Sequence, residues 1–389
     1  MRGTSPIEAT DGRILLFSMR NLARHVSRCA GYEFEDVISG CENVDVIAPR
    51  PPQGRTSRIG RILTTVLRRE APRVDDPIRI DRDYELFFAF CANPADLRYL
   101  TLIKGLHRRC RRTVCVIEEL WPGQISAHRR DLQILRKFDC VFSSLESSAA
   151  AIQAATGRPC HYLPLGIDTV LFSPYPSNPV RHIDVYNMGR RHANLHERLL
   201  AQGERGEMFY VYDTTADFSV IDPHEHRVLL ANQIKRSRYF VAYPPKFDAP
   251  AETGGQHEIG SRLFEGAAGG AVMLGLAPSC AAYDRSFDWP DAVIPTPANG
   301  RQIAALIAEL ESTPVRVAQI RRNNVVNSLR RHDWVYRWKQ IAERVGLSPA
   351  AQVAARQRRL EQMALAIAGD GLEDYFPLCE DVPQYSAAG

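Results

Sequence analysis

The sequence has no run of about 18 consecutive apolar residues, and its opening stretch MRGTSPIEATDGR lacks the apolar core of a signal peptide. We therefore expect no membrane span and no secretion. The nine cysteines are odd in number and scattered, without a Cys-x-x-Cys pair. This pattern is unlike a disulfide framework or a zinc site. The simplest interpretation is a reduced, cytoplasmic protein.

A strong excess of charge of one sign is also missing, because the net charge is only +4 over 389 residues. We therefore expect no nucleic-acid partner. Walker A, Gly-x-Gly-x-x-Gly and Gly-x-Ser-x-Gly patterns are absent, which argues against an ATPase, a dinucleotide oxidoreductase and a serine hydrolase. With 45% apolar and 24% charged residues, the composition is that of an ordinary globular protein of two to three domains.

Short β-favouring runs alternate with helical patterns along most of the chain. The expected helices include 21–38, 94–109 and 125–138. The expected strands are 13–19, 44–48, 84–90, 113–117, 140–143, 161–164, 182–186, 208–212, 239–243, 271–274 and 292–294. This alternation predicts α/β domains with parallel sheets and crossover helices. Ligands of such sheets bind at the carboxyl ends of the strands.

The stretch Glu252–Gly275 combines a glycine-bearing loop, a helix start and a buried strand. We expect the amide groups of Thr253, Gly254 and Gly255 to turn toward an anion, beside the free amides of a helix that starts near Gly260. Glu265, on the polar face of that helix, is placed to accept hydrogen bonds from ribose hydroxyls. The alternative is a plain Rossmann-like crossing with Glu265 solvated.

The segment from His257 to Glu265, followed by Gly-Ala-Ala-Gly-Gly, resembles the nucleotide-sugar motif Glu-x7-Glu of GT-B glycosyltransferases. Gly260 matches the glycine of the motif, and Glu265 matches the second glutamate, which binds the nucleotide ribose in the family. His257 stands where the first glutamate is expected, and Glu258 is one residue out of register. The residues Arg262-Leu-Phe-Glu265 resemble most closely the spore-maturation (CgeB-like) branch of these enzymes.

Three further segments are similar to the same enzymes. Leu163–Asp168 with Phe172–Pro174 resembles the end of the N-terminal domain, and the Pro-rich residues 175–179 suit a linker. Gly189-Arg190 matches a phosphate-binding Gly-Arg, although the expected lysine is missing and Arg191 is its substitute. His332–Arg337 matches a His-x-Trp-x-x-Arg segment, in which Asp333 is the expected helix cap.

The resemblance implies three parts: an acceptor domain over 1–172, a nucleotide-sugar domain over 181–333, and C-terminal helices with a tail over 334–389 that cross back. In this fold the two Rossmann-like domains face a cleft. Lys246, which follows a neighbouring strand, is expected to join the arginines at the pyrophosphate. The residues expected to bind the donor are Gly189, Arg190, Arg191, Lys246, Thr253, Gly254, Gly255, Glu258, Gly260, Arg262, Leu263 and Glu265.

Three residues are candidates for the catalytic group. Glu118 and Glu119 leave a predicted strand at its carboxyl end, where partial burial favours a general base. The alternative is that one glutamate caps the turn before Pro122 and the other is solvated. His257 is the third candidate, because its loop is expected to lie beside the donor sugar.

Metal sites were considered and set aside. Asp81 and Asp83 have the spacing of a metal-nucleotide Asp-x-Asp, but they precede a strand rather than follow one. Asp222, His224 and His226 lack a fourth ligand nearby, so a capped helix start is the better interpretation. We expect neither a metal nor a cofactor beyond the donor substrate.

Residues 55–69 interleave five arginines with apolar residues at helical spacing. The functional interpretation is a basic amphipathic helix that contacts an anionic membrane peripherally or binds an acidic acceptor; the other interpretation is a solvated helix on a sheet.

The sequence as a whole predicts a metal-independent glycosyltransferase with a nucleotide-diphosphate sugar as donor, an unidentified acceptor hydroxyl and possible retention of configuration. The alternatives are an epimerase or hydrolase of nucleotide sugars, or a binding protein that has lost catalysis.

Overall fold

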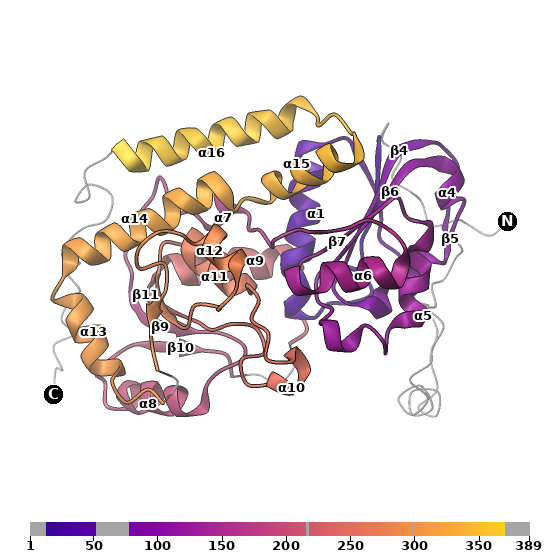
Figure 1. Ribbon diagram of the computed structural model, residues 1–389. Helices are drawn as coiled ribbons and strands as arrows, with labels where there is room; N and C mark the ends of the chain where they lie inside the picture. The colour runs from indigo at the N-terminus through magenta and orange to yellow at the C-terminus, as the bar shows by residue number, and fades with distance from the viewer. Residues whose placement is uncertain (1–12, 52–77, 215–217, 298, 370–389) are drawn as a thin grey trace. The chain divides into compact units, whose positions relative to one another are not determined.

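The computed structural model describes residues 13–51, 78–214, 218–297 and 299–369 (Figure 1). They form two compact units, each built around one parallel sheet. Unit 1 takes in residues 1–164, 219–223 and 338–353, and unit 2 takes in residues 165–218, 224–337 and 354–389. The predicted α/β class is therefore confirmed.

Unit 1 contains a six-stranded sheet in the order β2-β1-β4-β6-β7-β8, with every neighbouring pair parallel. Phe17, Phe87 and Ile117 are fully buried in its core, as expected for strands covered on both faces. Two short strands, β3 and β5, pair separately. The strand bounds are β1 Ile14–Phe17, β2 Val44–Ile47, β3 Ile78–Arg79, β4 Tyr84–Cys91, β5 Ile103–Lys104, β6 Cys110–Ile117, β7 Cys140–Ser143 and β8 Cys160–Tyr162.

The helices of unit 1 are shorter than the sequence predicts. The helix expected over 21–38 is present but begins only at Cys29 and ends at Cys41. The helices expected over 94–109 and 125–138 are each broken into short turns, so these two predictions are wrong. In the first broken region Ile103 and Lys104 pair with β3, and Gly105 turns the chain with a φ of 89°. The elements are η1 Val26–Arg28, α1 Cys29–Cys41, η2 Pro94–Asp96, α3 Leu97–Leu100, α4 Leu106–Arg109, η3 Pro122–Gln124, α5 Arg129–Leu132, η4 Gln133–Lys137, η5 Glu146–Ser148 and α6 Ala149–Thr156.

Unit 2 contains a five-stranded parallel sheet in the order β10-β9-β11-β12-β13. Counted along the unit, this is the doubly wound order 2-1-3-4-5, whose topological switch point lies between β9 and β11. Val185, Val241 and Leu274 are buried in its core. The strand bounds are β9 Ile183–Asn187, β10 Tyr210–Tyr212, β11 Ser237–Ala242, β12 Val272–Gly275 and β13 Ile294–Pro295.

The last helix of the described chain, α16, runs beside α14 (Figure 1). Arg330 of α14 forms an ion pair with Glu361 of α16 at 2.9 Å, and Arg322 donates to the carbonyl of Ala368. The helices that lie wholly or partly in unit 2 are α7 Thr169–Phe172, α8 Ala193–Glu204, α9 Pro223–Lys235, α10 Pro250–Thr253, α11 Ser261–Ala268, α12 Ala281–Ser286, α13 Ile303–Glu311, α14 Pro314–Arg331, α15 Trp334–Val345 and α16 Ala351–Gly369.

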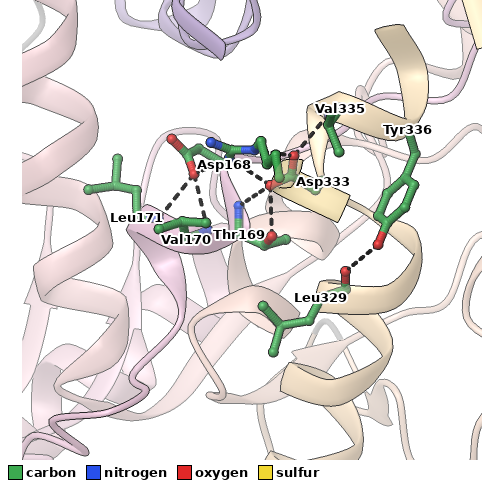
Figure 2. Close-up of polar contacts among 9 residues, drawn as sticks. Asp168, Thr169, Val170, Leu171, Leu329, Asp333, Val335 and Tyr336 are labelled. Carbon is green, nitrogen blue, oxygen red and sulfur yellow. Dashed lines mark hydrogen bonds and ion pairs between the residues drawn. The ribbon is translucent and has the colours of Figure 1, made fainter. Parts of the chain in front are cut away.

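Two distant stretches of unit 2 are joined just where the chain enters and leaves it (Figure 2). Ile167 and Asp333 form a parallel bridge, with Ile167 N–H donating to the carbonyl of His332 at 3.0 Å. The Asp333 carboxylate accepts from the amide and hydroxyl of Thr169, at 3.0 and 2.7 Å, and from the amide of Val335 at 2.9 Å. The expected cap at Asp333 is thus confirmed.

Arg356 of α16 ties these stretches together. Its guanidinium lies 2.6 Å from Asp168, which caps α7, and 2.8 Å from the fully buried Asp333. Gly166 permits the close approach, because a Cβ there would lie 2.7 Å from the Trp334 ring. The chain divides between units at 164/165, a few residues before the boundary that the sequence suggested.

Within the described residues, no helix is both long and apolar enough to cross a membrane. The predicted basic helix over 55–69 lies outside the described residues.

Candidate active site

The loops after β9 and β11 meet at the carboxyl edge of the unit 2 sheet, at its switch point. Gly189 follows β9 with a φ of 65°, and its amide donates to the Asp213 carboxylate, which follows β10. A Cβ at Gly189 would lie 2.5 Å from the Arg262 guanidinium. This position therefore favours glycine because of its backbone angle, and a larger residue would also displace the end of the Arg262 side chain.

The two arginines of the Gly-Arg-Arg turn have different surroundings. Arg190 is exposed and forms an ion pair with the exposed Asp248. Arg191 donates to the carbonyl of Asp213 at 2.7 Å and lies over the Tyr212 ring at 5.4 Å. Arg190 can exchange one anion for another, whereas Arg191 holds the neighbouring loop.

The loop after β11 brings a lysine to the same edge. Lys246 adopts a left-handed backbone with a φ of 52°, and its ammonium lies 2.9 Å from the exposed Glu252. The imidazole of His192, at the start of α8, packs on Phe247 and Tyr243 with centroid distances of 3.9 and 4.5 Å. Burial lowers the pKa of His192, so this ring is neutral at pH 7.

The amides of Thr253, Gly254 and Gly255, which were expected to bind an anion, donate to backbone carbonyls instead. Residues 250–253 form the short helix α10, and the amides of Gly254 and Gly255 both donate to the carbonyl of Pro250. The Thr253 amide donates to the Ala249 carbonyl at 3.3 Å, and the residue is buried. The prediction that these three amides turn toward an anion is therefore corrected for this structure, since closing the helix uses them.

Helix α11 begins where the sequence predicts, with Gly260 as its N-cap and no side chain capping it. Gly260 packs against Pro245, so the helix start lies beside the loop that carries Lys246. Leu263 is fully buried and belongs to the core rather than to the surface of the site. The Leu263 amide donates to the carbonyl of Gly260 at 3.2 Å, and the helix dipole gives this end of α11 a positive potential at the sheet edge.

Arg262 extends from the first turn of α11 across the site. It fills the space beside Gly189 and donates to the carbonyl of Arg190 at 3.2 Å. Desolvation lowers its pKa, while the charges of Glu265 and Asp213 oppose this effect. Arg262 therefore joins the β9 loop to the helix.

Glu265 is buried rather than solvated, with 2% of its surface exposed. Its Oε1 accepts from Arg227 of α9 at 2.6 Å, and Arg227 also lies over the Phe172 ring at 4.8 Å. Among the described residues, no group donates to the buried Oε2 of Glu265. One carboxylate oxygen thus retains hydrogen-bonding capacity, but the side chains around it have to move before a ligand reaches it.

The two residues at the start of the motif differ in exposure. His257 is exposed, and its Nδ1 accepts from the amide of Ser279 at 3.1 Å, which leaves its other nitrogen for a ligand. Glu258 is buried, with 2% of its surface exposed.

In unit 1, Glu118 and Glu119 follow β6 at the carboxyl edge of the sheet, as predicted. Their amides continue the pairing with β4 by donating to the carbonyls of Cys91 and Ala92, at 2.9 and 3.1 Å. Glu118 is half-buried. Burial lowers the pKa of Arg28, whereas Asp96 raises it and the charge of Glu118 raises it by a smaller amount. Glu119 is exposed and accepts from the indole of the buried Trp121 at 3.0 Å.

A buried carboxyl that the sequence did not single out lies near the same edge. Glu35 of α1 accepts from Ser18, directly after β1, at 2.5 Å, and from Arg20 at 3.0 Å. Burial raises its pKa to about 7, against the opposing charge of Arg20 and the hydrogen bond from Ser18. The only sequence signal was a glutamate inside an otherwise buried helix.

The two Asp/His segments considered as metal sites show no such cluster. In the part of the chain that the structure describes, no three His, Cys, Asp or Glu side chains are grouped so that they could hold a metal ion.

Part of this sequence is similar to a known protein family. Residues 220–343 match a family model described as glycosyl transferase-like. No curated protein matches the sequence at a significant level. Residues 220–343 include α9, α11 with Glu265, and the loop that carries Lys246.

Solved structures share the fold over most of their length. HepE of Anabaena, in complex with UDP-glucose, matches at a TM-score of 0.50 and 13% identity, over 86% of this chain and 99% of its own. An alpha-glucosyltransferase in complex with UDP and a 13-mer DNA matches at 0.53 and 13%, with the same coverage. The N-terminal domain of a Candida albicans trehalose-6-phosphate phosphatase matches at 0.50 and 8%, over 89% and 99%.

The two doubly wound sheets and the return of residues 338–353 to unit 1 agree with these likenesses. The chain has the fold of the GT-B glycosyltransferases, and its residues 220–343 match the model of a glycosyl transferase-like family.

Proposed function

We propose that the protein transfers a sugar from a uridine diphosphate sugar to an acceptor hydroxyl. The observation that carries this proposal is the convergence of Arg190, Lys246 and the uncapped start of α11 at the switch point of the unit 2 sheet. Three positively polarised groups at one sheet edge suit a diphosphate. Two solved structures of similar fold are complexes with UDP-glucose or UDP, which supports uridine as the nucleoside.

Each group has a part in this proposal. Arg190 and Lys246 exchange their carboxylate partners Asp248 and Glu252 for the diphosphate. The amides at Gly260 stabilise the negative charge that develops on the departing phosphate. Glu265 accepts a ribose hydroxyl through its second oxygen. No metal is required for these steps. The acceptor in this proposal is a compound that offers a hydroxyl group.

We expect Arg190→Ala to weaken UDP binding by roughly 10- to 150-fold, because it removes charge-assisted hydrogen bonds to phosphate. Uridine should bind equally to the variant and to the wild type. Arg191→Ala should weaken both ligands, because Arg191 holds the Asp213 loop. Isothermal titration calorimetry with UDP and uridine measures these effects. Arg205→Ala is the matched control, since Arg205 is an exposed arginine of the same unit paired with Glu207. Equal losses of UDP and uridine in Arg190→Ala would remove that residue from the phosphate.

For the catalytic group we choose Glu118, because it is half-buried at the carboxyl edge, whereas Glu119 is exposed. Glu118→Gln should slow single-turnover release of UDP from UDP-glucose, with water as acceptor, by at least about 100-fold without changing donor binding. Glu119→Gln keeps the indole bond and serves as the control. Near-normal release by Glu118→Gln together with an inactive His257→Ala would transfer the role to His257.

The same assays separate the alternatives. A hydrolase releases UDP and free sugar from UDP-glucose in every turnover, an epimerase forms a stereoisomeric UDP-sugar without net release of UDP, and a protein that has lost catalysis binds UDP without turnover. Retention or inversion of configuration follows from the anomer of the product.

A further inference from the structure

A cavity of about 550 Å³ lies in unit 1, away from the residues discussed so far. Its walls come from two segments, 100–108 and 133–138. These segments end directly before β6 and β7 begin, at Cys110 and Cys140. The cavity therefore lies at the amino edge of the sheet, whereas Glu118 leaves its carboxyl edge.

The floor of the cavity is apolar. Leu100, Ile103, Leu106 and Phe138 line it and are each at most 5% exposed, and Ile134 is half-buried beside them. None of these side chains offers a hydrogen-bonding group. A sugar or a free nucleotide would lose its hydrogen bonds to water against such a floor, whereas a hydrocarbon chain would gain by burial.

The rim of the cavity is cationic. Lys104, Arg108 and Lys137 line it and are exposed, and no carboxylate among the described residues forms an ion pair with any of them. The pKa of the adjacent His107 is lowered, first by burial and then by the charge of Lys137. The rim therefore carries three cations without an ion-pair partner among the described residues, although the nearby carboxylate of Asp139 opposes their effect on His107.

We propose that this cavity binds an anionic phospholipid of a membrane surface, with an acyl chain over the apolar floor and the phosphate among Lys104, Arg108 and Lys137. Charge complementarity selects this occupant. The chain's own segment 55–69 carries five arginines and would be repelled by the rim. A nucleic acid would use the cations but leave the apolar floor empty. The proposal is independent of the donor site, which belongs to unit 2.

The test is flotation of the full-length protein with vesicles of phosphatidylcholine alone or with 30% phosphatidylglycerol. The wild type should bind only the anionic vesicles, and less at high salt. The triple variant Lys104→Glu, Arg108→Glu, Lys137→Glu should lose on the order of 100-fold in partition, since each cation near an anionic surface contributes roughly fivefold. Ile134→Trp, which fills the cavity without changing charge, should also weaken binding.

The matched control reverses three exposed arginines of unit 2, Arg301, Arg358 and Arg359, with the same change in net charge. This control should bind vesicles nearly as the wild type does. All variants should keep UDP affinity and the circular dichroism of the wild type.

Four results would overturn the proposal. The first is equal binding of the wild type to neutral and anionic vesicles, and the second is an equal loss of binding in the two triple variants. The third is wild-type binding by the variant Lys104→Glu, Arg108→Glu, Lys137→Glu, which would assign the membrane contact to residues 55–69. The fourth is unchanged binding by Ile134→Trp. If the variant Lys104→Glu, Arg108→Glu, Lys137→Glu lost binding to a DNA duplex but kept binding to vesicles, the cavity rim would be a nucleic-acid surface instead.

Discussion

Arg227→Met should lower the free energy of unfolding of unit 2 by about 3–5 kcal/mol, because it leaves the Glu265 carboxylate buried without its counter-charge. The pair is close, at 2.6 Å, and both side chains are at most 4% exposed. The contact of Arg227 with the Phe172 ring is lost as well. Urea unfolding followed by tryptophan fluorescence, with hydrogen exchange to locate the change in unit 2, measures the effect.

The double variant Arg227→Met, Glu265→Leu separates stability from binding. Replacing both ions by apolar side chains of similar size removes the unpaired charge, so stability should return to within about 1–2 kcal/mol of the wild type. UDP affinity should stay low, because the acceptor for the ribose hydroxyl is gone. Recovery of both properties would make Glu265 a purely structural residue. A double variant as unstable as Arg227→Met would mean that the pair is not what stabilises this region.

The stability of unit 1 should fall as the pH rises from about 4.5 to 7, because Glu35 then holds a proton in the folded state and loses it on unfolding. Burial raises the pKa of Glu35 from 4.5 to about 7. The corresponding contribution is fully present below pH 4.5 and lost as the pH passes 7. Its size is about 3 kcal/mol, at about 1.4 kcal/mol per pH unit for one proton.

Glu35→Gln keeps the shape of the side chain but cannot titrate, so the fall between pH 4.5 and 7 should be smaller by that amount. Urea midpoints at half-unit steps of pH give the comparison, with Glu204→Gln as a control that removes an exposed carboxylate in unit 2. Parallel pH profiles of the wild type and Glu35→Gln would show that the buried carboxyl is not the source of the slope.

The strands of both sheets could be predicted from the sequence, because buried parallel strands are short runs of β-branched and aromatic residues bounded by turn residues. Phe87 and Val185 belong to such runs. The helices over 94–109 and 125–138 could not, since apolar spacing does not reveal that Ile103 leaves the helix to pair with β3. Tertiary pairing decided the structure there.

In the candidate site, the sequence predicted the start of α11 at Gly260 and the position of Glu265, because the cap and the helical period fix both. It could not predict the partner of Glu265, since Arg227 is 38 residues away on another helix. The use of the Gly254 and Gly255 amides in closing α10 was equally hidden, because glycine permits several turns and the sequence does not select one.

Unit 2 is formed by segments that are separate in the sequence, and Arg356 joins two of them. Residues 165–337 build its sheet, but the ion that pairs with the buried Asp333 comes from α16, after the chain has visited unit 1. A chimaera that exchanges the donor-side sheet with that of another protein must therefore exchange α16 with it. A crossover between residues 333 and 356 would separate Asp333 from Arg356, whereas exchange of the whole segment from residue 165 to the end of α16 keeps the pair together.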